Sequence, residues 1–347
     1  MPWAVEGRKP PAMKLVRFAL AVVLVATPGA ALAWGNTGHR IIGEAAVLAL
    51  PPELPAFVRT PQAAADIGEY SREPDRLKGA GKLFDNEHSP AHFVDLGDDG
   101  KIFGGPSLAA LPPTREDYDT ALRAVGQDSW KAGYLPYAIL DSYQRLAKDF
   151  AYWRVLKAAE ANPKWKAHRA WFAADRRRRE ALILQSAGQL SHFVGDGSQP
   201  LHVTIHFNGW GADQPNPQGF SNARLHGPFE SDLVQANVTR RMVEAKVAPR
   251  KPVTGALEKH TADYLAATGA LVIPFYGMEK AGGMAPGDAR GVAMATQQMA
   301  AGASELRDLI ADAWRVSATQ TVGWKPVAVA DVLAGKIDPY LALYGID

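Results

Sequence analysis

The stretch HFVGDGSQPLH, residues 192–202, combines a helix end with three potential metal ligands. At the end of a helix, His192 and Asp196 are four residues apart and share one face. The glycines and Pro200 then end the helix and let the chain return His202 to the same place. Imidazole nitrogens and carboxylate oxygens bind divalent cations, and a carboxylate can bridge two of them. The stretch therefore predicts a metal site, although a solvated helix end with surface histidines fits the same letters.

The composition predicts a folded chain without cysteine chemistry. The sequence has 347 residues, 47% of them hydrophobic and 21% charged, which is enough for one large domain or two small ones. It contains no cysteine, so disulfides, thiolate zinc sites and a cysteine nucleophile are excluded. Any metal must be held by His, Asp, Glu and backbone groups.

Residues 1–33 have the pattern of a secretory signal peptide. A basic segment precedes the apolar run 18–26, and Ala31-Leu32-Ala33 is a small-x-small cleavage signal. We therefore expect cleavage after this signal and a secreted or periplasmic protein, with either Met1 or Met13 as the true start. The remaining chain carries 34 basic and 35 acidic residues, so it is nearly neutral. A general polyanion-binding surface is not indicated, while a local basic patch stays open.

Cleavage at this point would make Trp34 the first residue of the mature protein. Its free α-amine and its carbonyl would lie five residues before His39, within chelating reach of a metal. A cleavage that merely happens to fall before a tryptophan would leave the same sequence.

The periodicity predicts one all-α domain over residues 34–347, a helical bundle with long connecting loops. Mostly loop is expected over 60–115 and again over 203–224, where Gly, Pro and polar residues are frequent. No alternation or turn signal indicates a β-hairpin. Helices are predicted at 37–50, 115–195, 228–247, 253–271 and 290–317, with a short one at the end.

Further histidine–carboxylate pairs accompany the 192–202 stretch. His226 precedes Glu230 by four residues at the start of a predicted helix. His92 stands in His-Phe-Val-Asp95, after the loop carboxylates Asp66 and Asp75. One such pair is common by chance, but several together indicate a metal centre.

These motifs together resemble the trinuclear zinc phosphodiesterases. The resemblance rests on Trp34-Gly-x-x-Gly-His39, His92-Phe-Val-Asp95, the 192–202 stretch and His226-x-x-x-Glu230, and it covers residue 34 to about 232. The superfamily has two branches, the zinc-dependent phospholipases C and the single-strand-specific zinc nucleases, both all-helical and exported. The resemblance implies a hydrolase of phosphate esters that uses zinc-activated water as its nucleophile.

Carried over residue by residue, the resemblance implies three Zn²⁺ ions. The first ion would be bound by Asp75, His92, His192 and Asp196. The second would be bound by His202, His226 and Glu230. The third would be bound by the amine and carbonyl of Trp34, by His39 and by the bridging Asp196.

Two roles have two candidates each: the aspartate ligand that precedes His92, and the general base. Asp66 and Asp75 stand in similar settings, and Asp75 is preferred for its distance from His92. Asp95 or Asp75 would orient the nucleophilic water as a general base. A helix or turn cap explains Asp95 equally well.

The resemblance divides between the two branches. The short Trp34-to-His39 step and the long 202-to-226 spacing favour the nuclease branch, whereas Glu230 in place of an aspartate and the lack of cysteines favour the phospholipase branch. The helical insert 96–190 departs from both. The 203–224 loop contains three aromatic residues, Phe207, Trp210 and Phe220. Their rings could stack on bases, enter a lipid surface or simply pack inside the loop.

We therefore expect a single-strand endonuclease or 3′-nucleotidase, acting on single-stranded nucleic acid or nucleotides, with a phospholipase C acting on phospholipid head groups as the alternative. No stable protein partner is implied, and a monomer is expected. A rival from another class is a non-catalytic exported zinc-binding protein. A fully protein-ligated site would favour that rival, because catalytic zinc keeps an open coordination position.

Overall fold

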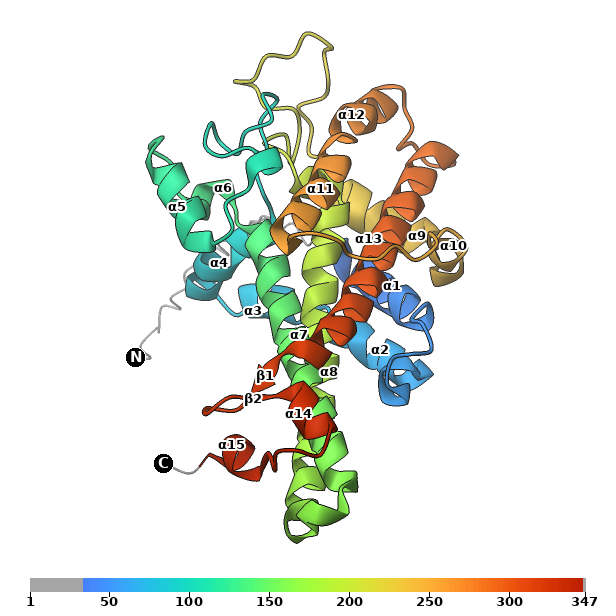
Figure 1. Ribbon diagram of the computed structural model, residues 1–347. Coiled ribbons are helices and arrows are strands. Elements are labelled where there is room, and N and C mark those ends of the chain that lie inside the picture. The colour runs from blue at the N-terminus through green and yellow to red at the C-terminus, as the bar shows by residue number, and fades with distance from the viewer. Residues whose placement is uncertain (1–33, 346–347) are drawn as a thin grey trace, which may run out of the picture. The chain divides into compact units, whose positions relative to one another are not determined.

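Two long helices joined by a short turn form the centre of the fold (Figure 1). Helix α7 spans Leu135–Ala161 and α8 spans Arg169–Ser198, with the 3-10 turn Pro163–His168 between them. They make the most extensive helix–helix contact in the protein, and α13, Ala289–Val316, packs against both. The prediction of helix over 115–195 is therefore confirmed for most of the region, and its two long helices lie in the core.

The computed structural model describes residues 34–345. The predicted signal peptide, residues 1–33, lies outside the described residues. The described part is mostly helical, which confirms the all-α class, and no helix in it is long and apolar enough to cross a membrane.

Helix α1, Gly35–Leu48, packs against α2, α8 and α13 and begins two residues earlier than predicted. Its N-cap is Trp34, which has the left-handed φ of 39° and makes no side-chain capping bond. Asn36 and Thr37 lie inside the first turn of α1. The indole of Trp34 is fully buried, at 0% exposed, and this fixes the backbone at the start of α1.

The prediction of mostly loop over 60–115 was wrong. Helix α2 spans Pro61–Tyr70, α3 spans Glu73–Lys78 and α4 spans Lys82–His88. The side chain of Thr60 caps α2, and proline at the first position suits its helical φ. With six and seven residues, α3 and α4 are too short to show a 3.6-residue hydrophobic period, which is why the pattern missed these two.

The remaining elements surround this core. The predicted helices beyond residue 228 are present, but α12 and a two-stranded antiparallel hairpin, β1–β2, were not predicted. The other α-helices are α5 Arg115–Arg123, α6 Ser129–Ala132, α9 Val234–Asn237, α10 Arg240–Glu244, α11 Leu257–Gly269, α12 Val272–Lys280, α14 Val329–Leu333 and α15 Tyr340–Tyr344. The strands are β1 Thr321–Val322 and β2 Val327–Ala328. Shorter helical turns lie at Ala56–Arg59, Ser89–His92, Leu108–Ala110, Pro200–His202, Pro228–Leu233 and Ser317–Thr319.

The 203–224 segment is a loop, as predicted, and its aromatics mostly pack within the protein. Trp210 is 2% exposed and Phe220 is 8% exposed, and both rings contact Tyr276. The ring of His206 stacks on Trp210 at 3.7 Å between centroids. Phe207 alone of the three aromatics is open to solvent, at 50%.

Candidate metal centre

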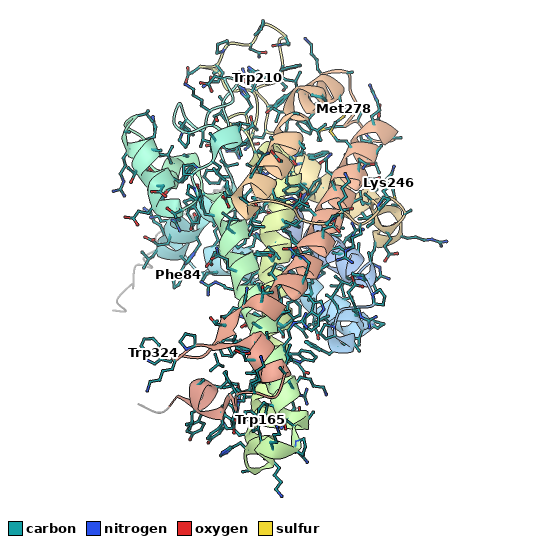
Figure 2. The ribbon with its side chains drawn as sticks, viewed as in Figure 1. Phe84, Trp165, Trp210, Lys246, Met278 and Trp324 are labelled. Atoms are coloured by element: carbon teal, nitrogen blue, oxygen red, sulfur yellow. The ribbon has the colours of Figure 1, made fainter. Side chains whose placement is uncertain are left out.

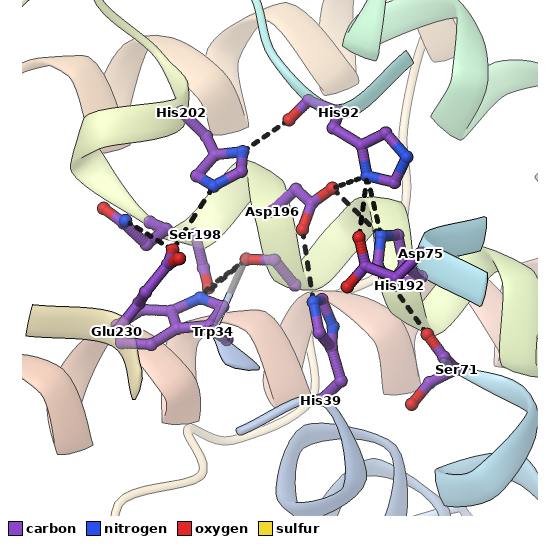
Figure 3. A network of polar contacts seen from close by, with 12 residues as sticks. Trp34, His39, Ser71, Asp75, His92, His192, Asp196, Ser198, His202 and Glu230 are labelled. Carbon is purple, nitrogen blue, oxygen red and sulfur yellow. Dashed lines mark hydrogen bonds and ion pairs between the residues drawn. The ribbon is translucent and has the colours of Figure 1, made fainter. Parts of the chain in front are cut away.

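The end of α8 has the geometry that its sequence predicts. His192 and Asp196 lie in its last turns, fully buried, and the helix ends at Ser198. Gln199 is extended, and its side-chain oxygen accepts the Leu201 amide at 2.6 Å. The following turn, Pro200–His202, brings His202 back toward the helix end (Figure 3).

Eight of the predicted ligand residues form three buried sets. Within each set the candidate ligand atoms all lie within 4.8 Å of one another. The sets are His39, His192 and Asp196; Asp75, His92 and His192; and His202, His226 and Glu230. They come from α1, α3, the Ser89–His92 turn, the end of α8, and the segments that follow it. The arrangement can hold metal ions.

Asp196 joins the first two sets. Its Oδ1 lies 3.4 Å from His39 Nε2. Its Oδ2 lies 3.1 Å from His92 Nδ1 and 3.4 Å from His192 Nε2. The two oxygens of one carboxylate thus face different imidazoles, the arrangement that a bridging ligand needs (Figure 3).

Three histidines are oriented by backbone carbonyls. Because a carbonyl only accepts a hydrogen bond, each of these Nδ1 atoms carries the proton, and Nε2 of the neutral ring presents a lone pair. A second-nitrogen hydrogen bond of this kind is typical of metal-binding histidines. The bonds run from His192 to Ser71 O at 2.6 Å, from His202 to His92 O at 2.6 Å, and from His226 to Phe207 O at 2.8 Å.

The third set shows why a cation fits. The Nε2 atoms of His202 and His226 face each other at 2.9 Å, and Glu230 Oε2 lies 2.8 Å from His226 Nε2. Two facing lone pairs cannot share a hydrogen bond without an added positive charge. Burial lowers the pKa of His226, but Glu230 overcomes this and raises it above its usual value. Burial would raise the pKa of Glu230, yet His226 and His202 lower it to about 2.

The first two sets also fit a cation better than a proton. Burial, reinforced by His192, lowers the pKa of His39 and His92 well below the usual range, so both rings are neutral at pH 7. Burial raises the pKa of Asp196 well above its usual range. Both ring nitrogens of His39 and the Oδ1 of Asp196 lack hydrogen-bond partners among the described residues. Buried polar atoms without partners are costly, and a metal ion would satisfy the Oδ1 of Asp196 and the unprotonated nitrogen of His39.

The structure distinguishes Asp75 from Asp66. Asp75, on α3, is 7% exposed and belongs to the second set, with its Oδ1 4.0 Å from His92 Nδ1. Asp66 lies on α2, outside every set, and accepts a hydrogen bond from Gln62. The geometry therefore supports Asp75 as the early aspartate ligand.

Lys78 and Ser71 contribute to the centre although the sequence did not single them out. Lys78 Nζ lies 3.3 Å from Asp75 Oδ1, and its side chain is 7% exposed. The only sequence signal for Lys78 was its position three residues after Asp75 on the same short helix. Ser71 contributes through its backbone carbonyl, which no residue pattern reveals.

Trp34 lies beside the end of α8. Its indole Nε1 donates to Gly195 O at 2.8 Å and to Ser198 Oγ at 2.9 Å. Its carbonyl accepts the amide of Gly38 at 2.9 Å, as the first bond of α1. Trp34 and Glu230 both line a cavity of about 310 Å³. The anchored indole thus fixes the backbone of the residue predicted to become the N-terminus.

Asp95 belongs to none of the three sets. It is 7% exposed, and burial raises the pKa of its carboxyl well above the usual range. Its backbone amide donates to Ala132 O at 2.9 Å. Its role as a general base stays a prediction.

No protein-family model matches the chain, and no curated protein matches its sequence significantly.

Replacing Asp75 by asparagine is expected to remove about one equivalent of bound metal, because the amide keeps the shape but loses the anionic ligand. The same change at Asp66, which lies outside the sets, is expected to leave the metal content unchanged. Elemental analysis of the two purified variants measures this. If the Asp66 variant loses the metal instead, the assignment of Asp75 is wrong.

Removing metal is expected to destabilise the protein. The buried imidazoles and carboxylates then face one another without a cation, and ligand linkage predicts a loss of about 4 kcal/mol at a metal concentration 1,000 times the dissociation constant. We expect a chelator to lower the Tm by at least about 5 °C, and added Zn²⁺ to restore it. Calorimetry of the mature protein with and without chelator measures the shift. An unchanged Tm would show that the centre binds no metal.

Proposed function

We propose that this protein is an exported, zinc-dependent hydrolase of phosphate esters. The observation that carries the proposal is that two buried ligand sets meet at His192 and Asp196, with the third buried set beside them. Imidazole nitrogens with carboxylate oxygens suit Zn²⁺, and nothing in the chain offers thiolate.

The charge of the centre supports an anionic substrate. The sets contain three carboxylates, Asp75, Asp196 and Glu230, and their imidazoles are neutral ligands. Three divalent ions would therefore leave a surplus of about three positive charges, to which Lys78 adds a fourth. A phosphate group is a natural counter-charge for such a centre.

The chain's own groups supply orientation and exclude water. Ser71, His92 and Phe207 hold three imidazoles through their carbonyls, so the Nε2 atoms point inward before any ion arrives. Bound zinc would polarise the phosphoryl oxygens and lower the pKa of a water molecule. Asp95 or Asp75 is the proposed acceptor for the proton of that water.

Within this reaction class we favour a single-strand nuclease or 3′-nucleotidase. Phe207 is 50% exposed, and its carbonyl holds His226 in the third set. An exposed ring this close to the centre suits stacking on a nucleobase, which is worth about 1–3 kcal/mol. The other two loop aromatics, Trp210 and Phe220, are buried and pack against Tyr276. A phospholipase C remains the second candidate because Glu230 replaces the aspartate of the nuclease branch.

The test compares three substrates on secreted protein with its native N-terminus: single-stranded DNA, 3′-nucleotides and phosphatidylcholine. We expect zinc-dependent cleavage of the first two. Phe207→Ala should raise the KM for DNA about tenfold with little change in kcat, whereas Phe84→Ala, at a ring that is 43% exposed on α4, should not. Cleavage of the lipid alone would favour the phospholipase. Three bound zinc ions with no turnover of any ester would contradict the proposal and favour a non-catalytic zinc-binding protein.

A further inference from the structure

The far end of the α7–α8 pair carries a second hydrophobic core that does not include the metal ligands. It is built from Val155, Leu156, Trp165 and Phe172 of the helix pair and from the C-terminal segment 321–345. The ring of His168 stacks on Tyr340 at 3.5 Å between centroids, and Trp171 meets Tyr344. The C-terminal hairpin and helices are therefore fixed against the turn of the helix pair. The proposed hydrolytic chemistry uses none of these groups.

Large apolar side chains are exposed on this end. Trp324, in the turn between β1 and β2, is 91% exposed (Figure 2). On α15, Leu341 is 63% exposed and Tyr344 is 54% exposed. The two elements are neighbours, because a Cβ on Gly323 would lie 2.6 Å from the carbonyl oxygen of Ala342. A single exposed apolar residue is ordinary, but three on adjoining elements form a patch.

The turn that carries Trp324 is held in place rather than loose. Gly323 has a φ of 94°, which a residue with a side chain rarely adopts, and its amide donates to the hydroxyl of Tyr152 at 3.0 Å. Strand pairing of Val322 with Val327 closes the turn. The indole thus projects from a rigid support, although nothing in its surroundings among residues 34–345 buries it.

The same end is strongly basic in an otherwise nearly neutral chain. Residues 154–180 and 321–345 contain eleven Lys and Arg against five Asp and Glu. Several pair locally: Arg176 binds Glu160 and Glu180. Four exposed cations at this end take part in none of the ion pairs found among residues 34–345: Lys164, Lys166, Arg169 and Lys325. Within the run Arg176–Arg179, Arg177 and Arg178 are exposed and the outer two are partly buried.

We propose that this end, the Trp324 face, docks on the surface of an anionic phospholipid bilayer. The face is defined as Trp324, Lys325, Leu341, Tyr344, Lys164, Lys166 and Arg169. Its tryptophan and tyrosine suit the boundary between head groups and acyl chains, and its cations suit anionic head groups. The aliphatic Leu341 favours lipid over nucleic acid, because stacking on bases uses aromatic rings. The proposal does not depend on the activity of the metal centre.

The test is co-sedimentation of the mature protein with vesicles of pure phosphatidylcholine or of phosphatidylcholine with 30 mol % phosphatidylglycerol. We expect binding to the anionic vesicles and a fall at high salt. Trp324→Ala should weaken binding about tenfold, and Lys325→Glu about fivefold or more. Trp130→Ala is the matched control, since Trp130 is 57% exposed but lies in α6, away from the elements that form the Trp324 face. It should bind like the unchanged protein.

The outcomes separate this proposal from its competitors. Equal loss in the Trp130 variant, or no preference for anionic vesicles, would overturn it. If the vesicles are not bound, two other results would also overturn it. One is a dimer that dissociates in the Trp324→Ala variant, and the other is binding of single-stranded DNA that requires Trp324. Quenching of Trp324 fluorescence by brominated lipid, taken as the difference from Trp324→Phe, should locate the indole at the interface. Circular dichroism of each variant checks the fold.

Discussion

Asp196→Asn is expected to lower hydrolysis by at least about 100-fold and to reduce the bound zinc by more than one equivalent. One carboxylate faces His39 through Oδ1 and both His92 and His192 through Oδ2, so two ion sites depend on it. Mutation of residues that only hydrogen-bond to metal ligands costs about 10–100-fold in metal affinity or activity, and loss of a ligand shared by two ions should cost more. An asparagine keeps the size and one acceptor but cannot bridge two cations.

The matched control is Asp149→Asn, at another buried aspartate. Asp149 is 2% exposed and pairs with Arg179 at 2.7 Å, so its loss costs stability without touching the metal sets. We expect a lower Tm for that variant but unchanged zinc content and unchanged kcat per folded molecule. Elemental analysis and steady-state kinetics on both variants measure the difference. An Asp196 variant that keeps three ions and full kcat would exclude Asp196 as the bridge.

The helix end at 192–202 was predictable because its information is local. The i,i+4 spacing fixes a shared face, and the proline fixes the helix stop, whatever the rest of the chain does. The pair His226–Glu230 follows the same rule, and its side chains lie 2.8 Å apart. Residue types and spacing were sufficient at both places.

The parts that the sequence missed depend on short elements and on the backbone. Asp75 itself was predicted, but the six-residue helix α3 that carries it was not, because it is too short for a hydrophobic period to appear. The carbonyls of Ser71 and Phe207 orient two histidines from 121 and 19 residues away. A carbonyl is present at every residue, so only the fold shows which one is used. The β1–β2 hairpin has two residues per strand, too few for alternation to be visible.

Retaining an initiator methionine before Trp34 is expected to remove one zinc equivalent and lower activity about 100-fold or more. The indole of Trp34 is bound to Gly195 and Ser198, the neighbours of Asp196 on α8. The indole thereby anchors Trp34 against the end of α8, the helix that carries the proposed bridge Asp196. Signal-peptide cleavage would make the backbone nitrogen of Trp34 a basic amine with a lone pair for a metal, whereas an amide nitrogen has none to donate. Maturation would then complete the centre.

The experiment uses one protein in two states: an extended form with a removable N-terminal segment, and the same preparation after a protease has exposed Trp34. The two states differ only at the N-terminus, where the segment is removed and the α-amine freed, so misfolding cannot explain a difference that cleavage repairs. We expect two zinc ions before cleavage and three after it, with activity rising in parallel. Trp34→Phe, cleaved in the same way, should keep the amine but lose the indole bonds, and so bind the third ion more weakly. Three ions and full activity in the uncleaved form would show that Trp34 is no ligand, because the site would then be complete without a free amine.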